Sequence, residues 1–244
     1  MTAARLPTLI VGVAAVALLA YGPIAQFADY HAFADTRTWL GIPNAADVLS
    51  NAAFAGIGAW AVARLWPHRG HPALARGWAG WMLFAASLVL TAAGSSWYHL
   101  APDDSRLVWD RLPIALGCAG ILAAVRAETC GRSGSLWPTL VLSVAAVASV
   151  AWWRQSGDLR PYLLLQASPL VLVPLWQTIH GAPSADRTAF AVAILLYAAA
   201  KAAELADRWI YGLSGVVSGH TLKHLLAAAA AGVIVARLIA RVRR

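Results

Sequence analysis

Three histidines of this sequence stand at spacings typical of a metal site. His220 and His224 are four residues apart in 218-SGHTLKHLL-226, so on a helix both side chains share one face, about 6 Å apart along the axis. A third histidine, His99, lies near the end of 94-GSSWYHL-100. Three imidazoles around one open coordination position form a catalytic zinc arrangement. An i, i+4 histidine pair with a third ligand from elsewhere in the chain is a common way to build such a site.

A serine and an aspartate accompany these histidines. Ser95 precedes His99 by four residues and shares its helix face, and Asp110 follows His99 after eleven residues, in 107-LVWDRLP-113. Zinc lowers the pKa of a bound water to about 7. Asp110 would hold that water and accept its proton, while Ser95 would donate a hydrogen bond to the oxyanion or to the water. Alternatively, Asp110 orients one of the ligand imidazoles.

Other interpretations of the histidines stay open. A single histidine in an apolar helix is more often a hydrogen-bonded packing residue, and an H-x-x-x-H pair alone is a weak indication. A bis-histidine haem needs one histidine from each of two helices, so it would leave one histidine and Asp110 without a role. Three histidines and a carboxylate together favour zinc.

The composition indicates which elements must position these side chains. The 244 residues are 60% hydrophobic and only 12% charged, which excludes a disordered chain, a basic nucleic-acid-binding domain and an ordinary soluble enzyme. Two cysteines, Cys118 and Cys130, are too few for a disulfide framework or a thiolate metal site. Eight segments are apolar and long enough to cross a bilayer as helices, namely 6–27, 46–66, 78–99, 106–125, 136–153, 160–179, 188–209 and 219–240.

These segments predict an all-α integral membrane protein, a polytopic helical bundle. Residues 1–27 would form an extra N-terminal transmembrane helix with signal-like features, since Arg5 precedes the hydrophobic stretch and small residues follow it. The length of that stretch favours a retained helix. Residues 28–45 would form an acidic outer loop, and residues 46–244 a domain of seven spans.

The distribution of charge predicts how the bundle is oriented. The connection 64–77 and the tail 237–244 carry arginines and no acidic residue, so both should be cytoplasmic. The connections 28–45 and 100–105 are acidic and should face outward. Eight spans with both termini inside satisfy all four assignments. All five candidate residues then fall at the same depth, near the outer face.

The residue pattern resembles the alkaline ceramidase family, which belongs to the CREST superfamily of membrane hydrolases and adipoQ-type receptors. The resemblance rests on the S-x-x-x-H motif ending at His99, Asp110 eleven residues later, and the H-x-x-x-H motif of the last span, and it covers about residues 44–240. It implies seven spans matching the second to the eighth, zinc on the three histidines, and Ser95 and Asp110 at the zinc-bound water. It also implies hydrolysis of a ceramide amide to a long-chain base and a fatty acid.

The chain departs from that family in its acidic loop. Eukaryotic members carry a calcium-binding Asp-Trp-x-Glu-x-Asn stretch and a further glutamate there, whereas residues 28–51 contain no glutamate. Asp29, Asp35, Asn44 and Asp47 still offer hard oxygen ligands suitable for calcium. The interpretation we favour is that they cap helices and order the outer loop.

Further charged residues lie within the predicted spans. Lys201, Glu204 and Asp207 recur along the seventh span, and Lys223 in the eighth span is available to neutralise an acid there. They predict an interhelical charge network that stabilises the bundle. Arg111, beside Asp110, is expected to pair with an outer carboxylate or to meet a lipid headgroup.

Together these patterns predict a zinc-dependent intramembrane hydrolase acting on the linear amide bond of ceramide or a related N-acyl lipid. Its partner would be the lipid substrate within the bilayer, with neither a nucleic acid nor a protein partner expected. The Ala/Arg-rich sequence is typical of a bacterial inner membrane protein. One alternative is a receptor or sensor of the adipoQ type with a structural zinc. Another is a transporter or proton relay, which would need polar residues continuing into the inner half of the bundle.

Overall fold

Long apolar helices dominate the computed structural model, which describes residues 5–131 and 134–243. Within these residues no β-strand occurs, and seven helical segments are long and apolar enough to cross a membrane. They are α2, α3 and the short turn of helix after them (Ala45–Ser50, Ala52–Leu65 and Trp66–His68), α5 (Trp78–Leu100), α6 (Asp104–Cys130), α7 (Leu136–Ser156), α8 (Arg160–Ile179), α9 (Ser184–Leu205) and α11 (Gly219–Val242). The fold is therefore the predicted all-α polytopic bundle.

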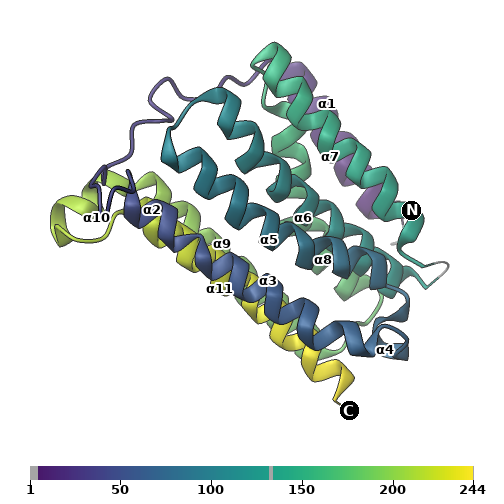
Figure 1. Cartoon of the computed structure of the whole chain (residues 1–244). Coiled ribbons are helices and arrows are strands. Elements are labelled where there is room, and N and C mark those ends of the chain that lie inside the picture. The colour runs from purple at the N-terminus through teal and green to yellow at the C-terminus, as the bar shows by residue number, and fades with distance from the viewer. Residues whose placement is uncertain (1–4, 132–133, 244) are drawn as a thin grey trace.

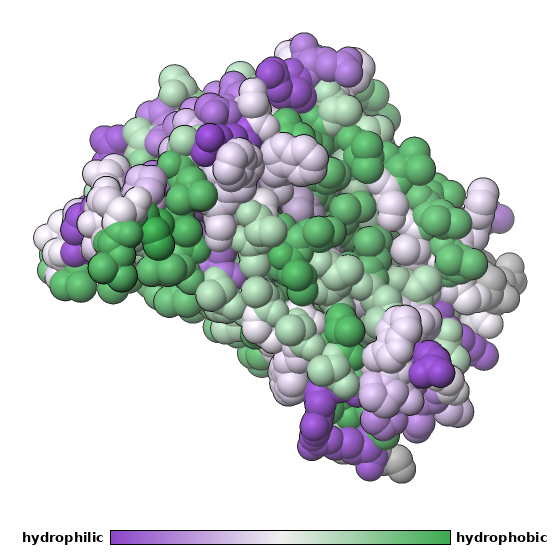
Figure 2. All heavy atoms as spheres, viewed as in Figure 1, coloured by the Kyte–Doolittle hydropathy of each residue, from purple (hydrophilic) through white to green (hydrophobic). Residues whose placement is uncertain are grey.

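The long helices run beside one another between two ends of the molecule (Figure 1). One end carries α2 and the short helix α10 (Asp207–Ser214), and the other carries α4 (Pro72–Ala75) and the end of α11. Figure 2 shows hydrophilic residues gathered mainly toward these two ends, with hydrophobic residues over the helices between them. This distribution suits a protein that crosses a membrane, because its middle would face lipid.

The first predicted span is shorter than the sequence indicated. Helix α1 covers Leu6–Tyr21, 16 residues, and not residues 6–27. It ends there because Gly22 has a φ of 95° and Pro23 follows, a pair that does not continue a helix. Sixteen residues rise about 24 Å, less than the roughly 30 Å hydrocarbon core of a bilayer.

The seventh predicted span also ends earlier than expected. Helix α9 stops at Leu205, and the chain then turns into α10, whose Trp209 and Leu213 side chains are exposed. Residues 206–209, predicted to continue the span, therefore belong to the connection and to α10. Gly215, at a φ of 64°, ends α10 shortly before α11 begins.

A charged pair between α7 and α8 holds the end of α1. Asp158 pairs with Arg160 at 2.8 Å and accepts a hydrogen bond from the Ile24 backbone N–H at 3.1 Å. The Arg160 guanidinium in turn donates to the Leu18 carbonyl at 3.2 Å. Its hydrogen bonds hold the pKa of Asp158 below the ordinary value of 3.8. The pair therefore joins α1 and the chain after it to the start of α8.

Helices α5 and α6 form an antiparallel hairpin whose backbones touch. Asp103 caps α6 by accepting a hydrogen bond from the Arg106 N–H at 2.8 Å. Six residues before the end of α5, Gly94 faces α6 so closely that a Cβ added there would overlap the Trp109 carbonyl oxygen. Only glycine permits this approach, which brings Ser95 and Asp110 to the same level.

We expect Gly94→Ala to destabilise the fold by about 1–3 kcal/mol, because the added methyl group must push α5 away from α6. Thermal unfolding in detergent measures this loss. Gly56→Ala is the matched control, because no atom lies within 4 Å of a Cβ added at Gly56 on α3. Equal unfolding temperatures for the two variants would contradict the close contact.

The lowered pKa of Asp158 makes its contribution to stability depend on pH. Since its pKa is depressed in the folded state, its stabilisation is complete above the unfolded value of 3.8 and declines as the pH falls below it. Asp158→Asn should lower stability by about 2 kcal/mol at pH 6 through weakened charged hydrogen bonds, and by less at pH 3. Thermal unfolding at both pH values tests this, with Asp29→Asn, an exposed aspartate, as control. A difference from the wild type that stays constant or widens at pH 3 would contradict the assignment.

Candidate metal centre

The three histidines singled out from the sequence meet at one point of the structure. His99 lies in the last turn of α5, and His220 and His224 lie in the first two turns of α11. Each offers one ring nitrogen, and these three nitrogens lie within 4.8 Å of one another. All three side chains are buried. Among the residues that the structure describes, this is the group of histidine, cysteine and carboxylate side chains that could hold a metal ion.

The hydrogen bonding of His99 fits a metal ligand. Both of its ring nitrogens are buried and have no hydrogen-bond partner among the described residues. Buried polar atoms are nearly always paired, and a neutral imidazole has one lone pair and one N–H to satisfy. A metal ion at one nitrogen would supply the missing partner for that lone pair.

The hydrogen bonds of His224 leave one nitrogen free to bind a metal. Its Nδ1 lies 2.8 Å from the Ser50 hydroxyl oxygen, and the Ser50 O–H is directed to the Asp47 carbonyl at 3.0 Å. Because Ser50 uses its hydrogen there, its oxygen accepts from an Nδ1–H of His224. The lone pair then sits on Nε2, the tautomer that a metal ligand at this nitrogen needs.

His220 has a cation beside it. The Lys223 ammonium lies 2.8 Å from the Nε2 atom of His220 and 3.0 Å from a carboxylate oxygen of Glu204. An ammonium only donates, so Nε2 accepts in this arrangement. A metal ion bound at Nε2 would displace the ammonium, which would keep Glu204 as its partner, whereas a metal at Nδ1 would leave this contact in place.

Ser95 and Asp110 lie next to each other beside the histidines. The side chain of Ser95 is 1% exposed and that of Asp110 is 8% exposed, and both line one large cavity with His220 and His224. The sequence predicted that these residues lie at one depth, and in the structure they line one cavity. A carboxylate and a hydroxyl therefore face the side of the metal centre that opens into the cavity.

The cavity is long and mostly apolar. Its volume is about 1040 Å³, and it reaches from the histidines into the bundle between α5, α6, α8, α9 and α11. Aliphatic side chains line its deeper part, among them Ile114, Ile121, Leu170, Val173, Ile194 and Ile234. A cavity with this lining and a polar end suits a molecule with a long hydrocarbon chain and a polar group.

Residues 22–44, which we call the strap, connect α1 to α2 and run past the end of the bundle that carries α10 (Figure 1). The Phe33 ring lies 4.7 Å from the His99 ring and 4.5 Å from the His220 ring, centroid to centroid. His31 hydrogen-bonds the Tyr98 hydroxyl at 2.8 Å, and the Ala34 N–H donates to Asp207 at 2.9 Å. The sequence does not indicate this role of Phe33, because no pattern marks an isolated aromatic residue in a loop as a neighbour of distant histidines.

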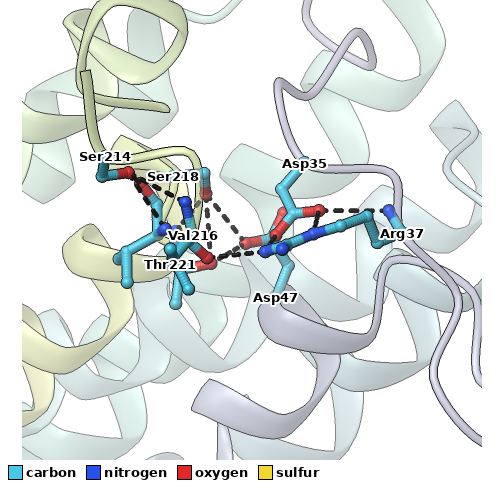
Figure 3. Close-up of polar contacts among 8 residues, drawn as sticks. Asp35, Arg37, Asp47, Ser214, Val216, Ser218 and Thr221 are labelled. Atoms are coloured by element: carbon cyan, nitrogen blue, oxygen red, sulfur yellow. Dashed lines mark hydrogen bonds and ion pairs between the residues drawn. The ribbon is translucent and has the colours of Figure 1, made fainter. Parts of the chain in front are cut away.

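The acidic residues considered for calcium have other partners. Asp35 pairs with Arg37 at 2.6 Å, and the hydrogen bonds from Arg37 lower the pKa of Asp35. Arg37 also donates to the Val216 carbonyl at 2.6 Å, and the Asp47 carboxylate accepts from the Thr221 hydroxyl at 2.6 Å. Figure 3 shows these contacts joining the strap and α2 to the loop before α11 and to the first turn of α11.

The remaining two residues of that set lie apart from this arrangement. The Asn44 amide donates to the His99 carbonyl at 2.7 Å, and Asp29 lines the cavity. Asp29, Asp35 and Asp47 do not gather into a metal-binding group within the described part of the chain. The calcium site stays a prediction, and the interpretation that these residues order the strap fits their contacts.

The predicted charge network forms with three of its four members. Glu204 accepts from Lys201 at 2.6 Å and from Lys223 at 3.0 Å, which links α9 to α11. The prediction was wrong for Asp207, which begins α10 and accepts from the His220 backbone N–H at 2.7 Å. Asp207 thus stabilises the start of α11 and does not pair with the lysines.

Comparison with known proteins gives no relative: no family model, no curated protein and no solved structure matches the chain. The centre is therefore interpreted from its own side chains. Three buried histidines can hold a metal ion beside a buried carboxylate, a hydroxyl and an apolar cavity.

Substitution of Ser50 tests whether its hydrogen bond with His224 supports metal binding. We expect Ser50→Ala to weaken metal binding about 10- to 100-fold, because the His224 tautomer is no longer fixed. Ser50→Thr keeps the hydroxyl and should restore most of the affinity. Ser96→Ala is the matched control, since the Ser96 hydroxyl also bonds a backbone carbonyl nearby, that of Val48, without touching a histidine. Competition titration with a chelating dye measures all four proteins, and equal affinities for Ser50→Ala and Ser96→Ala would contradict the role of Ser50.

Proposed function

We propose that the protein is a zinc-dependent hydrolase that works within the membrane and cleaves the amide bond of an N-acyl lipid, ceramide or a related molecule. The observation that carries the proposal is the group of three buried histidine nitrogens within 4.8 Å of one another, at the polar end of a cavity that also contains Asp110 and Ser95. The residue pattern that resembles the alkaline ceramidase family supports the same activity.

The donor set favours zinc over other metals. Three imidazoles with no thiolate, and with one position left for water or substrate, are typical of catalytic zinc. Zinc in such a site supplies a Lewis acid that polarises a carbonyl group and lowers the pKa of water. Ser50 orients one ligand, and the burial of the other two limits competition from bulk water.

The side chains beside the histidines have the chemistry that amide hydrolysis needs. Asp110 positions the attacking water, takes its proton as the oxygen bonds to the acyl carbon, and passes that proton to the leaving nitrogen as the C–N bond breaks. Ser95 donates a hydrogen bond to the carbonyl oxygen as it gains negative charge. The products are a fatty acid and an amine, which for ceramide is the long-chain base.

The cavity supports a lipid as the substrate. Its aliphatic lining offers a place for an acyl chain, and its polar end would hold the amide next to Asp110. A lipid already dissolved in the bilayer would enter sideways between helices. Phe33 of the strap covers the histidines from the polar end and so limits their contact with water.

We further propose that the α10 end faces the outside of the cell and that both termini are cytoplasmic, in a bacterial inner membrane. The basic connection 64–77 and the basic tail lie at the opposite end, which is the arrangement that the positive-inside rule favours. The metal centre would then lie near the outer face of that membrane.

Asp110→Asn tests the hydrolase directly. The amide cannot accept a proton from water, so we expect fatty acid release to fall about 10²- to 10⁴-fold while the bound zinc stays at one per chain. Asp104→Asn, an exposed aspartate on the same helix, is the control and should hydrolyse normally. Fatty acid release from ceramide and a panel of N-acyl lipids, together with metal analysis, measures both quantities.

Two outcomes would contradict the proposal. If activity survives complete removal of the metal by a chelator, the metal centre takes no part in the reaction. If the purified protein holds one zinc per chain and hydrolyses no lipid of the panel, the centre is structural, and a receptor or sensor becomes the better interpretation.

A further inference from the structure

Arg111 is a buried cation without a carboxylate partner. Its side chain follows Asp110 on α6 and is 3% exposed, and its Nη1 atom has no hydrogen-bond partner in the part of the chain that the structure describes. None of the ion pairs among those residues includes it. Lys201 and Lys223, which line the same cavity, both pair with Glu204.

Aromatic rings surround the Arg111 guanidinium. Its central carbon lies 3.9 Å from the centre of the Trp153 ring, 5.0 Å from that of Tyr30 and 5.6 Å from that of Tyr162. The faces of these rings attract a cation, but they do not replace the oxygen acceptors that the guanidinium N–H groups prefer. A buried charge held only by aromatic rings remains incompletely compensated.

This cation lies in the wall of the cavity beside the reacting groups. Arg111, Tyr30 and Tyr162 line the cavity that Asp110 and Ser95 also line. Arg111 and Asp110 are consecutive on α6, so their side chains leave the helix about 100° apart at almost the same height. Because both side chains line the same cavity, a ligand with its amide at Asp110 shares that space with the Arg111 guanidinium.

We propose that Arg111 binds a carboxylate on the amine-derived part of the lipid substrate. The planar guanidinium presents paired N–H donors that match the two oxygens of a carboxylate, and a buried arginine binds such a group more strongly than an exposed one. The inference rests on the proposed hydrolase and narrows its substrates to acidic N-acyl lipids, such as N-acyl amino acids, over neutral ones. The rings of Tyr30, Trp153 and Tyr162 hold the guanidinium in position.

Two substrates that share an acyl chain provide the test. N-oleoylglycine and N-oleoylethanolamine differ only in carrying a carboxylate or a hydroxymethyl group. We expect wild-type kcat/KM to be at least tenfold higher for the glycine conjugate, and Arg111→Gln to bring the ratio of the two values close to one. Arg106→Gln is the matched control, because Arg106 on the same helix also stacks on a tryptophan, Trp97, but pairs with Asp103 at the surface. It should keep the wild-type ratio.

A binding measurement separates this inference from the hydrolase itself. Thermal stabilisation of the Asp110→Asn protein by each lipid needs no turnover, and N-oleoylglycine should stabilise it more than either N-oleoylethanolamine or free oleate. Hydrolysis of both lipids at equal kcat/KM would overturn the inference and leave the hydrolase standing. Equal stabilisation by oleate and N-oleoylglycine would also overturn it, because the arginine would then recognise the fatty acid. Selective, Arg111-dependent stabilisation without hydrolysis by the wild type would support the binding site and refute the hydrolase.

Discussion

Two close contacts between helix backbones set the geometry of the metal centre. At Gly94, α5 touches the backbone of α6 near Asp110, and at Gly219 a Cβ would overlap the Ala203 carbonyl oxygen of α9. Each glycine immediately precedes a residue of the site, Ser95 in one case and His220 in the other. In lipid, helices gain little from hydrophobic attraction, so close packing at small residues has to hold them together. The two contacts fix the height of α5 against α6 and of α11 against α9, and so the level at which each helix presents its histidines.

The start of α11 explains the acidic residues at this end of the molecule. A helix begins with unpaired backbone N–H groups and a partial positive charge. Asp207 accepts from the His220 N–H, Ser218 accepts from the Thr221 N–H at 2.9 Å, and Asp47 accepts from the Thr221 hydroxyl. These side chains therefore secure the turn that carries two of the three histidines. The same chemistry that attracts calcium, carboxylate oxygens near the membrane surface, is here used to cap a helix.

The sequence predicted those parts of the structure that depend on residues close together in the chain. Hydropathy located seven spans within a few residues, and the spacing from His220 to His224 fixed their common face. Gly22 and Pro23 could also have indicated the end of α1 at Tyr21, but the apolar residues around them obscured it. The end of α9 at Leu205 has no comparable breaker in the sequence, because Ala206 and Asp207 are compatible with a helix.

Contacts between segments far apart in the chain could not be predicted from the sequence. Ser50 and His224 are 174 positions apart, and only the packing of α2 against α11 brings the hydroxyl to the imidazole. Phe33 reaches the histidines because Arg37 and Ala34 attach the strap to the α10 end. Such contacts depend on the whole fold, so a pattern of residue types along one segment cannot reveal them.

The cavity and the strap act differently on the same centre. An apolar cavity reaching into the bundle suits a lipid chain, whereas the proposed hydrolysis would also need water and a path for the released amine. The rings of Phe33, His99 and His220 pack together at the polar end, so an aromatic side chain from a segment without helical structure covers this side of the histidines. A loop is suited to this position, because it can yield to a small polar molecule while α5 and α11 keep the histidines in place. In the proposed hydrolase, the helices therefore hold the metal ligands and the strap limits how much water reaches them.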